Sequence, residues 1–184
     1  YAHCWSLLDA LVDRPPAATG TGDDRVTWRS YLLLGLVGLL VTLFVAAFQP
    51  VPGYMDADYY YAGGLQFVTG HGFTEPYFWN FLDDPTGLPH PSHGYWMPLA
   101  SLLAAAGAIL FGPGSWSAAR VGFVLVAGCI PPLTAALAWS FTSRRDLSMT
   151  SGLLAAFSSF YLPFLSTTET FGLYMLFGGA FLLV

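Results

Sequence analysis

Two carboxylates separated by one residue, Asp56 and Asp58, begin a tyrosine-rich stretch just after an apolar segment. On a helix that turns about 100° per residue, Asp56 shares a face with Tyr60, whereas Asp58 points about 200° away from Asp56. The two carboxylates are therefore not expected to form one tight pair. A carboxylate held among aromatic rings at a bilayer surface can act as a general base on a hydroxyl acceptor, or orient it. The alternative is that Asp56 caps the first turn of a surface helix.

Two other ionisable residues stand at the edges of apolar segments, Arg120 and Glu169. The planar guanidinium of Arg120 could bind two phosphate oxygens at once, or the side chain could simply extend to the lipid headgroups. Carboxylates at membrane depth are costly and tend to be functional. At a helix start, however, Glu169 could instead interact favourably with the helix dipole. The sequence leaves both pairs of alternatives open.

The histidines of the same region, His90 and His93, are three residues apart and would share a face on a helix. Pro91 and Gly94 disfavour a regular helix there, and no spacing typical of zinc enzymes occurs. We interpret both histidines as polar loop residues in or near a substrate cleft. We assign no residue to a metal site and no cofactor with certainty, and a divalent metal ion stays open.

Composition sets the environment in which these residues must work. Hydrophobic residues make up 55% of the chain and charged residues 9%, whereas a soluble domain carries about a quarter charged residues. The sequence therefore predicts an integral membrane protein. The formal net charge is −5 and lysine is absent, which argues against nucleic acid as a partner.

The elements that must position the candidate residues are apolar segments of membrane-spanning length. Arginine precedes the first of them, whereas the stretch from Gln49 to Tyr95 contains no Lys or Arg. By the positive-inside rule, residues 1–29 form a cytoplasmic tail and the outer loop 49–120 is extracytoplasmic. The expected spans are at about 31–48, 121–141, 149–165 and 171–184.

The apolar run 95–111 has two interpretations. If it crossed the membrane, Arg144 and Arg145 would face outside, against the positive-inside rule. If it lies along the outer surface, as interfacial helices do, they face the cytoplasm, and residues 166–169 return to the outer side near the long loop. We prefer the surface interpretation, with juxtamembrane helices at about 56–69 and 96–111.

These elements together predict an all-α fold, a polytopic transmembrane helical bundle with juxtamembrane helices in a long first outer loop. The sequence has no initiating Met and stops within an apolar run. We therefore expect residues 30–184 to form the N-terminal part of a larger multi-pass protein of the cell membrane.

Three motifs carry a resemblance to a known family: Asp56-Ala57-Asp58-Tyr59-Tyr60-Tyr61, Gly70-His71-Gly72-Phe73, and the His/Pro/aromatic stretch from His90 to Leu99. They resemble the first outer loop of membrane-embedded glycosyltransferases of the GT-C class. The nearest are the protein O-mannosyltransferase and lipid A aminoarabinose transferase type and related family 39-like bacterial enzymes.

The resemblance implies a glycosyltransferase that moves a sugar from a polyprenyl-phosphate carrier to an acceptor on the outer face, with inversion at the anomeric carbon. It implies a lipid-linked sugar donor and membrane lipid as partners, Asp56 as the catalytic base and Asp58 in support. The expected substrate-binding residues are Tyr60, His90, His93, Arg120 and Glu169. The alternative is a non-enzymatic membrane protein, either a transporter or a lipid-binding scaffold.

Overall fold

The computed structural model describes residues 26–78, 86–158 and 160–184, so nearly all of the expected tail at 1–29 lies outside the described residues. Helices dominate these ranges. In chain order the elements are α2 (Trp28–Ala47), α3 (Met55–Val68), β1 (Thr74–Glu75), β2 (His90–Pro91), α4 (Leu99–Phe111), α5 (Trp116–Ala119), α6 (Val121–Thr142), α7 (Arg145–Ala156), α8 (Leu162–Leu165) and α9 (Phe171–Leu183). The short antiparallel pair β1–β2 is an addition to the all-α expectation.

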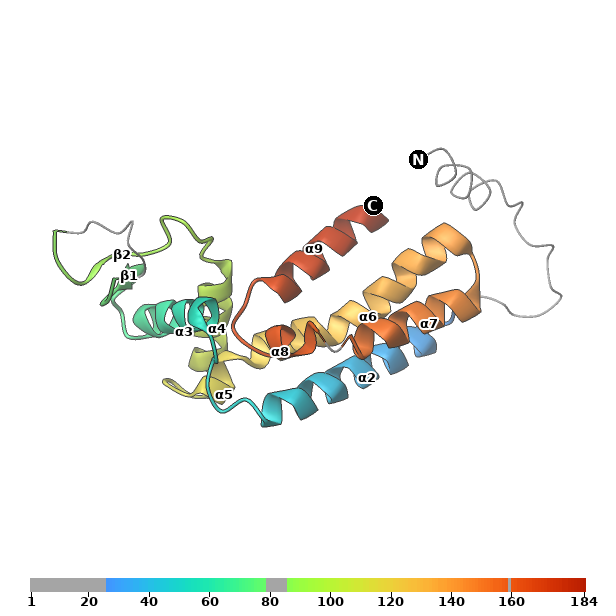
Figure 1. Ribbon diagram of the computed structural model, residues 1–184, viewed down its shortest axis with the longest axis horizontal. Helices are drawn as coiled ribbons and strands as arrows, with labels where there is room; N and C mark the ends of the chain where they lie inside the picture. The colour runs from blue at the N-terminus through green and yellow to red at the C-terminus, as the bar shows by residue number, and fades with distance from the viewer. Residues whose placement is uncertain (1–25, 79–85, 159) are drawn as a thin grey trace.

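The helices form an elongated bundle with a smaller cap at one end (Figure 1). Helix α6 lies at the centre of the bundle and packs against α2, α7 and α9, while α3 and α4 pack on each other in the cap. Two helical stretches, Trp28–Ala47 and Trp116–Thr142, are long and apolar enough to cross a membrane. They indicate membrane association, whereas the multi-pass arrangement stays a prediction.

One expected helix differs from the structure. The predicted span 149–165 is divided into α7, which ends at Ala156, and the single-turn helix α8, which begins at Leu162. Pro163 disfavours continuation of one helix through 162–165, because a proline removes the helical hydrogen bond to the residue four before it and its ring clashes with that residue's carbonyl. Proline is tolerated in the first turn of a helix, and Pro163 occupies that position in α8.

Small residues allow the bundle helices to approach closely. A Cβ atom added at Gly38 of α2 would lie 2.6 Å from Cγ of Pro131 in α6. A Cβ atom at Gly152 of α7 would lie 3.0 Å from the carbonyl oxygen of the same proline. Close backbone approach through small residues is how helices associate in a membrane, where burial of apolar surface gives no driving force.

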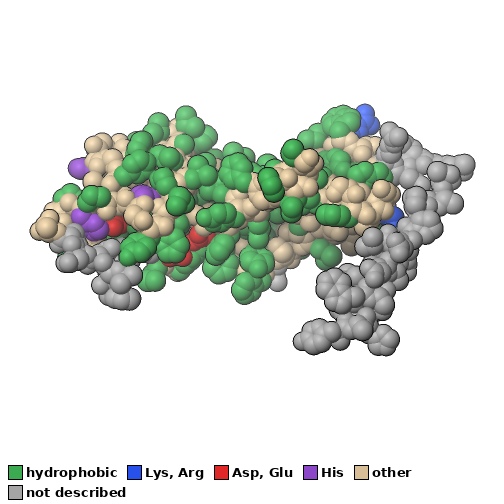
Figure 2. All heavy atoms as spheres, turned by 90° about the horizontal axis from the view of Figure 1, so that it is seen from above, with side chains coloured by type: hydrophobic (Ala, Val, Ile, Leu, Met, Phe, Trp, Pro, Cys, Tyr) green, Lys and Arg blue, Asp and Glu red, His purple; other side chains and the backbone are tan. Residues whose placement is uncertain are grey.

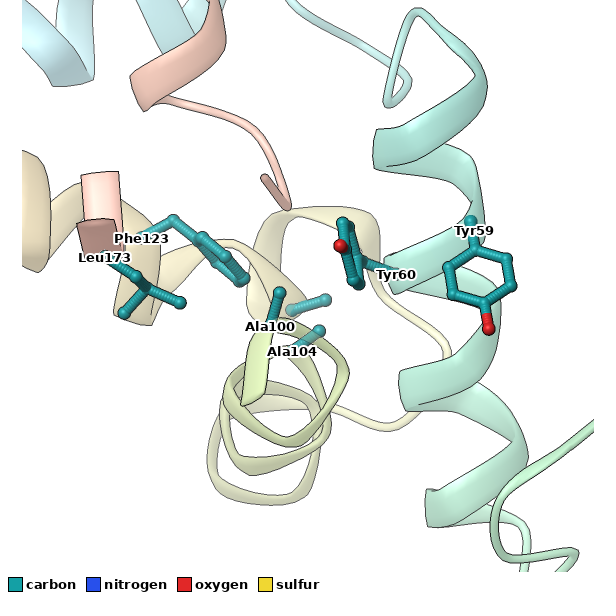
Figure 3. Close-up of a cluster of buried hydrophobic side chains, with 7 residues drawn as sticks. Tyr59, Tyr60, Ala100, Ala104, Phe123 and Leu173 are labelled. Carbon is teal, nitrogen blue, oxygen red and sulfur yellow. The ribbon is translucent and has the colours of Figure 1, made fainter. Parts of the chain in front are cut away.

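The cap is joined to the bundle by a cluster of buried side chains around Tyr60 (Figure 3). The Tyr60 ring extends from α3 toward Ala100 and Ala104 of α4, with Phe123 of α6 and Leu173 of α9 beyond them. Tyr60 is only 2% exposed, so its position on α3 is fixed by packing. The same packing fixes the first turn of α3, where Asp56 lies.

Positively and negatively charged side chains lie at different places along the molecule (Figure 2). On the face shown, arginines occur at one end, and the Asp, Glu and His side chains lie away from that end, with hydrophobic side chains over much of the surface. The α6–α7 turn, with Arg144 and Arg145, lies at the same end as the start of α2 (Figure 1). Helix α4 packs mainly on α3 and α5 in the cap, which is consistent with the surface interpretation of 95–111.

Candidate functional site

The connection from α8 to α9 is buried against the chain that leads into α3. We call residues 166–170 the α8–α9 linker. Its first four side chains are at most 3% exposed, and a buried polar group needs hydrogen-bond partners. The partners come from more than a hundred residues away in the sequence: Ser166 Oγ donates to Gln49 Oε1, Thr167 Oγ1 to the carbonyl of Pro52 at 3.2 Å, and Thr168 Oγ1 to the carbonyl of Ala57 at 2.7 Å. The expected proximity of residues 166–169 to the long loop is therefore confirmed.

Glu169 is the most deeply buried carboxylate at this junction, with 3% of its surface exposed. Its Oε2 accepts a hydrogen bond from the Tyr54 hydroxyl at 2.6 Å. Its Oε1 accepts from the backbone N–H of Thr170 at 2.6 Å and from the Thr170 hydroxyl at 2.8 Å. Three donors compensate for the burial of this side chain. Burial and the hydrogen bond to Glu169 raise the pKa of Tyr54 far above its usual range.

Asp56 lies half-buried on the first turn of α3, within electrostatic range of Glu169. Burial first, and the negative charge of Glu169 second, raise the pKa of Asp56 above its ordinary value. No side chain caps the start of α3, whose N-cap residue is Tyr54, so the capping interpretation of Asp56 finds no support. Burial and the charge of Glu169 shift the protonation of Asp56, and no capping hydrogen bond at the start of α3 contributes.

Tyr60 is the fourth residue near Glu169, after Tyr54, Asp56 and Thr170. Burial raises its pKa, and the charges of Glu169 and Asp56 raise it further. We call Tyr54, Asp56, Tyr60 and Glu169 the acidic cluster. Three of the four are predicted site residues, and Tyr54 is the one that the sequence reasoning missed. The sequence carries no local signal for Tyr54, because its partner Glu169 lies 115 positions away.

Asp58 does not join the acidic cluster. Its side chain is exposed, and it contributes to the raised pKa of Tyr77, after burial and the charge of Glu75. The helix therefore directs Asp58 toward the β1–β2 side of the cap and Asp56 toward the α8–α9 linker. The geometry gives Asp58 no direct contact through which to support Asp56.

His90 lies in the β1–β2 pair, directly opposite Glu75. Its Nε2 lies 3.1 Å from the carbonyl oxygen of Tyr77 and 3.4 Å from Oε1 of Glu75. These contacts connect the two strands to each other. The structure thus places His90 in the scaffold of the cap and outside the acidic cluster.

His93 also has partners within the cap. Its backbone is left-handed, with φ of 63°, and its amide donates to the Tyr59 hydroxyl at 2.6 Å. Its ring nitrogens lie 2.6 Å from Oγ of Ser92 and 2.9 Å from Oγ of Ser101, which connects the loop to α4. Burial lowers the pKa of His93, so the neutral ring is favoured. The structure does not bring it to Asp56.

Arg120 lies where α5 meets α6. Its Nη1 donates to the carbonyl oxygen of Gln49 at 3.0 Å, and the Trp116 indole donates to the same oxygen at 3.0 Å. The guanidinium also lies over the Trp116 ring, 5.4 Å from its centroid. Because the Gln49 side chain accepts from Ser166, Arg120 is connected through one residue to the α8–α9 linker.

The described residues contain no group of three or more His, Cys, Asp and Glu side chains that could hold a metal ion. Within the acidic cluster, Asp56 and Glu169 are the two carboxylates that could contribute ligands. Each oxygen of Glu169 already accepts a hydrogen bond. The divalent metal ion considered from the sequence stays a prediction.

The acidic cluster can take up a proton through Asp56, the carboxylate that is partly open to solvent. Its raised pKa makes it a stronger base than an ordinary aspartate. The Tyr54–Glu169 pair holds the adjoining backbone in place. Searches of protein-family models, curated proteins and solved structures find no match for this chain.

Proposed function

We propose that this chain belongs to a multi-pass membrane glycosyltransferase that transfers a sugar from a polyprenyl-phosphate carrier to a hydroxyl acceptor at the extracytoplasmic face. The observation that carries the proposal is the position of Asp56. It is a half-buried carboxylate with a raised pKa on the first turn of α3, where the α8–α9 linker of the bundle packs against the cap. The sequence resemblance around Asp56 supplies the reaction class.

The reaction requires one base. The acceptor oxygen attacks the anomeric carbon, the bond from that carbon to the phosphate oxygen breaks, and the polyprenyl phosphate leaves with the bonding electrons. Asp56 takes the acceptor proton as the new bond forms, and the anomeric centre inverts. General-base catalysis of this kind contributes roughly 10²–10⁴-fold to a rate.

The remaining cluster residues act through Asp56. The charge of Glu169 adds to burial, the larger cause, in raising the pKa of Asp56, and Tyr54 holds Glu169 in place through the 2.6 Å hydrogen bond. Tyr60 fixes the helix that carries Asp56 through its packing against α4. We assign Glu169, Tyr54 and Tyr60 as positioning residues.

The distribution of charge supports the proposed orientation. The arginine-bearing α6–α7 turn and the start of α2 lie at the bundle end opposite the cap (Figure 1). The positive-inside rule places such an end in the cytoplasm. The acidic cluster then lies on the other side, at the membrane surface, where a lipid-anchored donor can reach it.

The test is Asp56→Asn in the full-length protein, reconstituted in vesicles with a polyprenyl-phosphate sugar and assayed for transfer. We expect a loss of about 10²–10⁴-fold in kcat. Asp146→Asn is the matched control, because Asp146 lies at the start of α7 and is exposed, and it should keep full activity. A folded Asp56→Asn protein with normal turnover would contradict the proposal.

A further inference from the structure

Gln49 follows the C-cap residue of α2, at the point where the chain leaves the bundle for the cap. It is partly exposed, yet both polar groups of its side chain form hydrogen bonds. Its Nε2 donates to the carbonyl oxygen of Pro163 in α8 at 2.8 Å, and its Oε1 accepts from the Ser166 hydroxyl. The side chain therefore joins the end of α2 to α8 and to the first residue of the α8–α9 linker.

The backbone carbonyl of Gln49 contacts another part of the bundle. It accepts from the Trp116 indole and from Nη1 of Arg120, both at 3.0 Å. These donors belong to α5 and to the residue that joins α5 to α6. The two donors hold the backbone of Gln49 against α5 and α6, while its side chain holds the start of the α8–α9 linker.

The α8–α9 linker lies beside the segment that leads from Gln49 into α3. The first four linker side chains all form hydrogen bonds with this segment. The contacts pair Ser166 with Gln49, Thr167 with Pro52, Thr168 with Ala57 and Glu169 with Tyr54. The contact at Gln49 is the first of the four along both segments, and the same residue reaches α5, α6 and α8. Its loss would release the start of the linker and leave the other three contacts in place.

The surroundings of Asp56 depend on the position of this linker. Glu169, near the end of the linker, is 3% exposed and lies within electrostatic range of Asp56. Burial first, and the charge of Glu169 second, raise the pKa of Asp56. Both causes require the linker to stay against α3. Water that enters a loosened junction would solvate Asp56, and a displaced Glu169 would interact with it less.

We infer that Gln49 is a positioning residue for Asp56, because its side-chain contact with Ser166 fixes the α8–α9 linker against the first turn of α3. The part of Gln49 in sugar transfer rests on the proposed function. A misplacement of about 1 Å caused by a change far from the reacting atoms can cost roughly 10²-fold in rate. Gln49 therefore affects the reaction without touching a substrate.

Gln49→Met is the variant that tests the inference, because methionine has a similar length and lacks the amide group. The change removes both side-chain hydrogen bonds and keeps the backbone carbonyl with its two donors. Ser166 retains the carbonyl oxygens of Leu162 and Pro163 as acceptors, at 3.2 and 3.3 Å, so we expect the variant to fold. Gln66→Met is the matched control, since Gln66 is also partly exposed and lies near the other end of α3.

The measurement is the pH dependence of labelling by dicyclohexylcarbodiimide, which reacts with protonated carboxyl groups in apolar surroundings. The full-length protein is labelled in phosphatidylcholine vesicles, and peptide mass spectrometry distinguishes Asp56 from the other carboxyl groups. In Gln49→Met we expect the midpoint of Asp56 labelling to move to lower pH than in the wild type. Gln66→Met should keep the wild-type midpoint. A folded variant that is only less stable should keep it as well.

Ser166→Ala removes the same contact from the side of the linker. It should also move the midpoint of Asp56 labelling to lower pH, and it provides the test if Gln49→Met does not fold. The double variant should move the midpoint no further than Gln49→Met alone, because residues that share one contact do not contribute additively.

Three results would overturn the inference: an unchanged or raised midpoint in folded Gln49→Met, additive shifts in the double variant, or no labelling of Asp56 in the wild type across the acidic range. The labelling requires no sugar transfer, so this inference and the proposed function fail separately. A lowered midpoint in a protein that transfers no sugar supports the positioning by Gln49 and contradicts the proposed function. An unchanged midpoint in a protein whose sugar transfer requires Asp56 contradicts the positioning alone.

Discussion

Asp56 and Asp146 both lie near the start of a helix, at opposite ends of the molecule, yet their pKa values are shifted in opposite directions. Asp56, on α3, is half-buried, and burial together with the charge of Glu169 raises its pKa. Asp146, on α7, accepts hydrogen bonds from Arg144 at 2.6 and 3.2 Å, which lower its pKa. The side chains of Arg144 and Asp146 are 52% and 64% exposed. The same residue type is thus a stronger base at the cap and a weaker one at the other end.

The neighbours cause this difference. At the cap, the α8–α9 linker buries a second carboxylate, Glu169, which accepts two hydrogen bonds from Thr170 of the linker and one from the Tyr54 hydroxyl. At the other end, a short turn leaves Arg144 and Asp146 in solvent, where an ion pair contributes little to stability. The comparison indicates that the cap retains a costly arrangement of charges, which is typical of a functional site.

The largest effect on stability is expected for Glu169→Ala. This change removes three hydrogen bonds to a buried carboxylate and leaves the Tyr54 hydroxyl without its acceptor. Because hydrogen bonds to charged groups contribute roughly 1.5–3 kcal/mol each and neighbouring losses are not additive, we expect a loss of about 3 kcal/mol in the free energy of unfolding. Asp146→Ala should change it by less than about 0.5 kcal/mol. Denaturant unfolding in detergent measures both free energies. Equal losses would contradict the difference proposed between the buried carboxylate at the cap and the exposed one at the other end.

A smaller effect is expected for Thr168→Val. Thr168 is fully buried and donates to the carbonyl of Ala57 at 2.7 Å, so valine leaves that carbonyl without this partner. The expected cost is about 1–2 kcal/mol. The matched control is Thr150→Val on α7, where the threonine is exposed and the change should cost less than about 0.5 kcal/mol. If both variants unfold alike, the α8–α9 linker does not hold the cap as described.

The smallest effect concerns the pH dependence of stability. Burial lowers the pKa of His93 below its ordinary value of about 6.5, so the unfolded chain binds this proton more readily than the folded one. The contribution of His93 is therefore complete above about pH 6.5 and is lost as the pH falls toward the lowered pKa. His93→Gln should flatten this part of the stability profile. A profile unaffected by His93→Gln would contradict the account.

Local sequence patterns predict the helices well and the contacts between them poorly. The expected helix at 56–69 is found at Met55–Val68, and that at 171–184 at Phe171–Leu183, because hydrophobicity and local turn signals define such segments. The break before Pro163 was missed because the flanking residues are as apolar as a span. The Tyr54–Glu169 hydrogen bond joins residues 115 positions apart, and nothing local to either residue indicates it.

The candidate site, too, is predicted from local spacing in part, whereas its tertiary contacts are not. The spacing on a helix separates Asp56 from Asp58, and the structure places them in different surroundings. The interpretation of His90 and His93 as cleft residues came from their residue type, since the sequence does not reveal that Glu75, Tyr59 and Ser101 contact them. Residue chemistry suggests candidates, whereas the tertiary contacts decide which of them meet.

The pH dependence of kcat/KM for sugar transfer, compared between the wild type and Glu169→Gln, tests the central claim most directly. A base must be ionised, so the raised pKa of Asp56 places the acidic limb of the wild-type profile above the range of an ordinary aspartate, about 3.9. Glu169→Gln removes a negative charge and keeps an acceptor for Tyr54, so the limb should move to lower pH. An unmoved limb, or one that moves to higher pH, would contradict the assignment of Asp56 as a base controlled by Glu169.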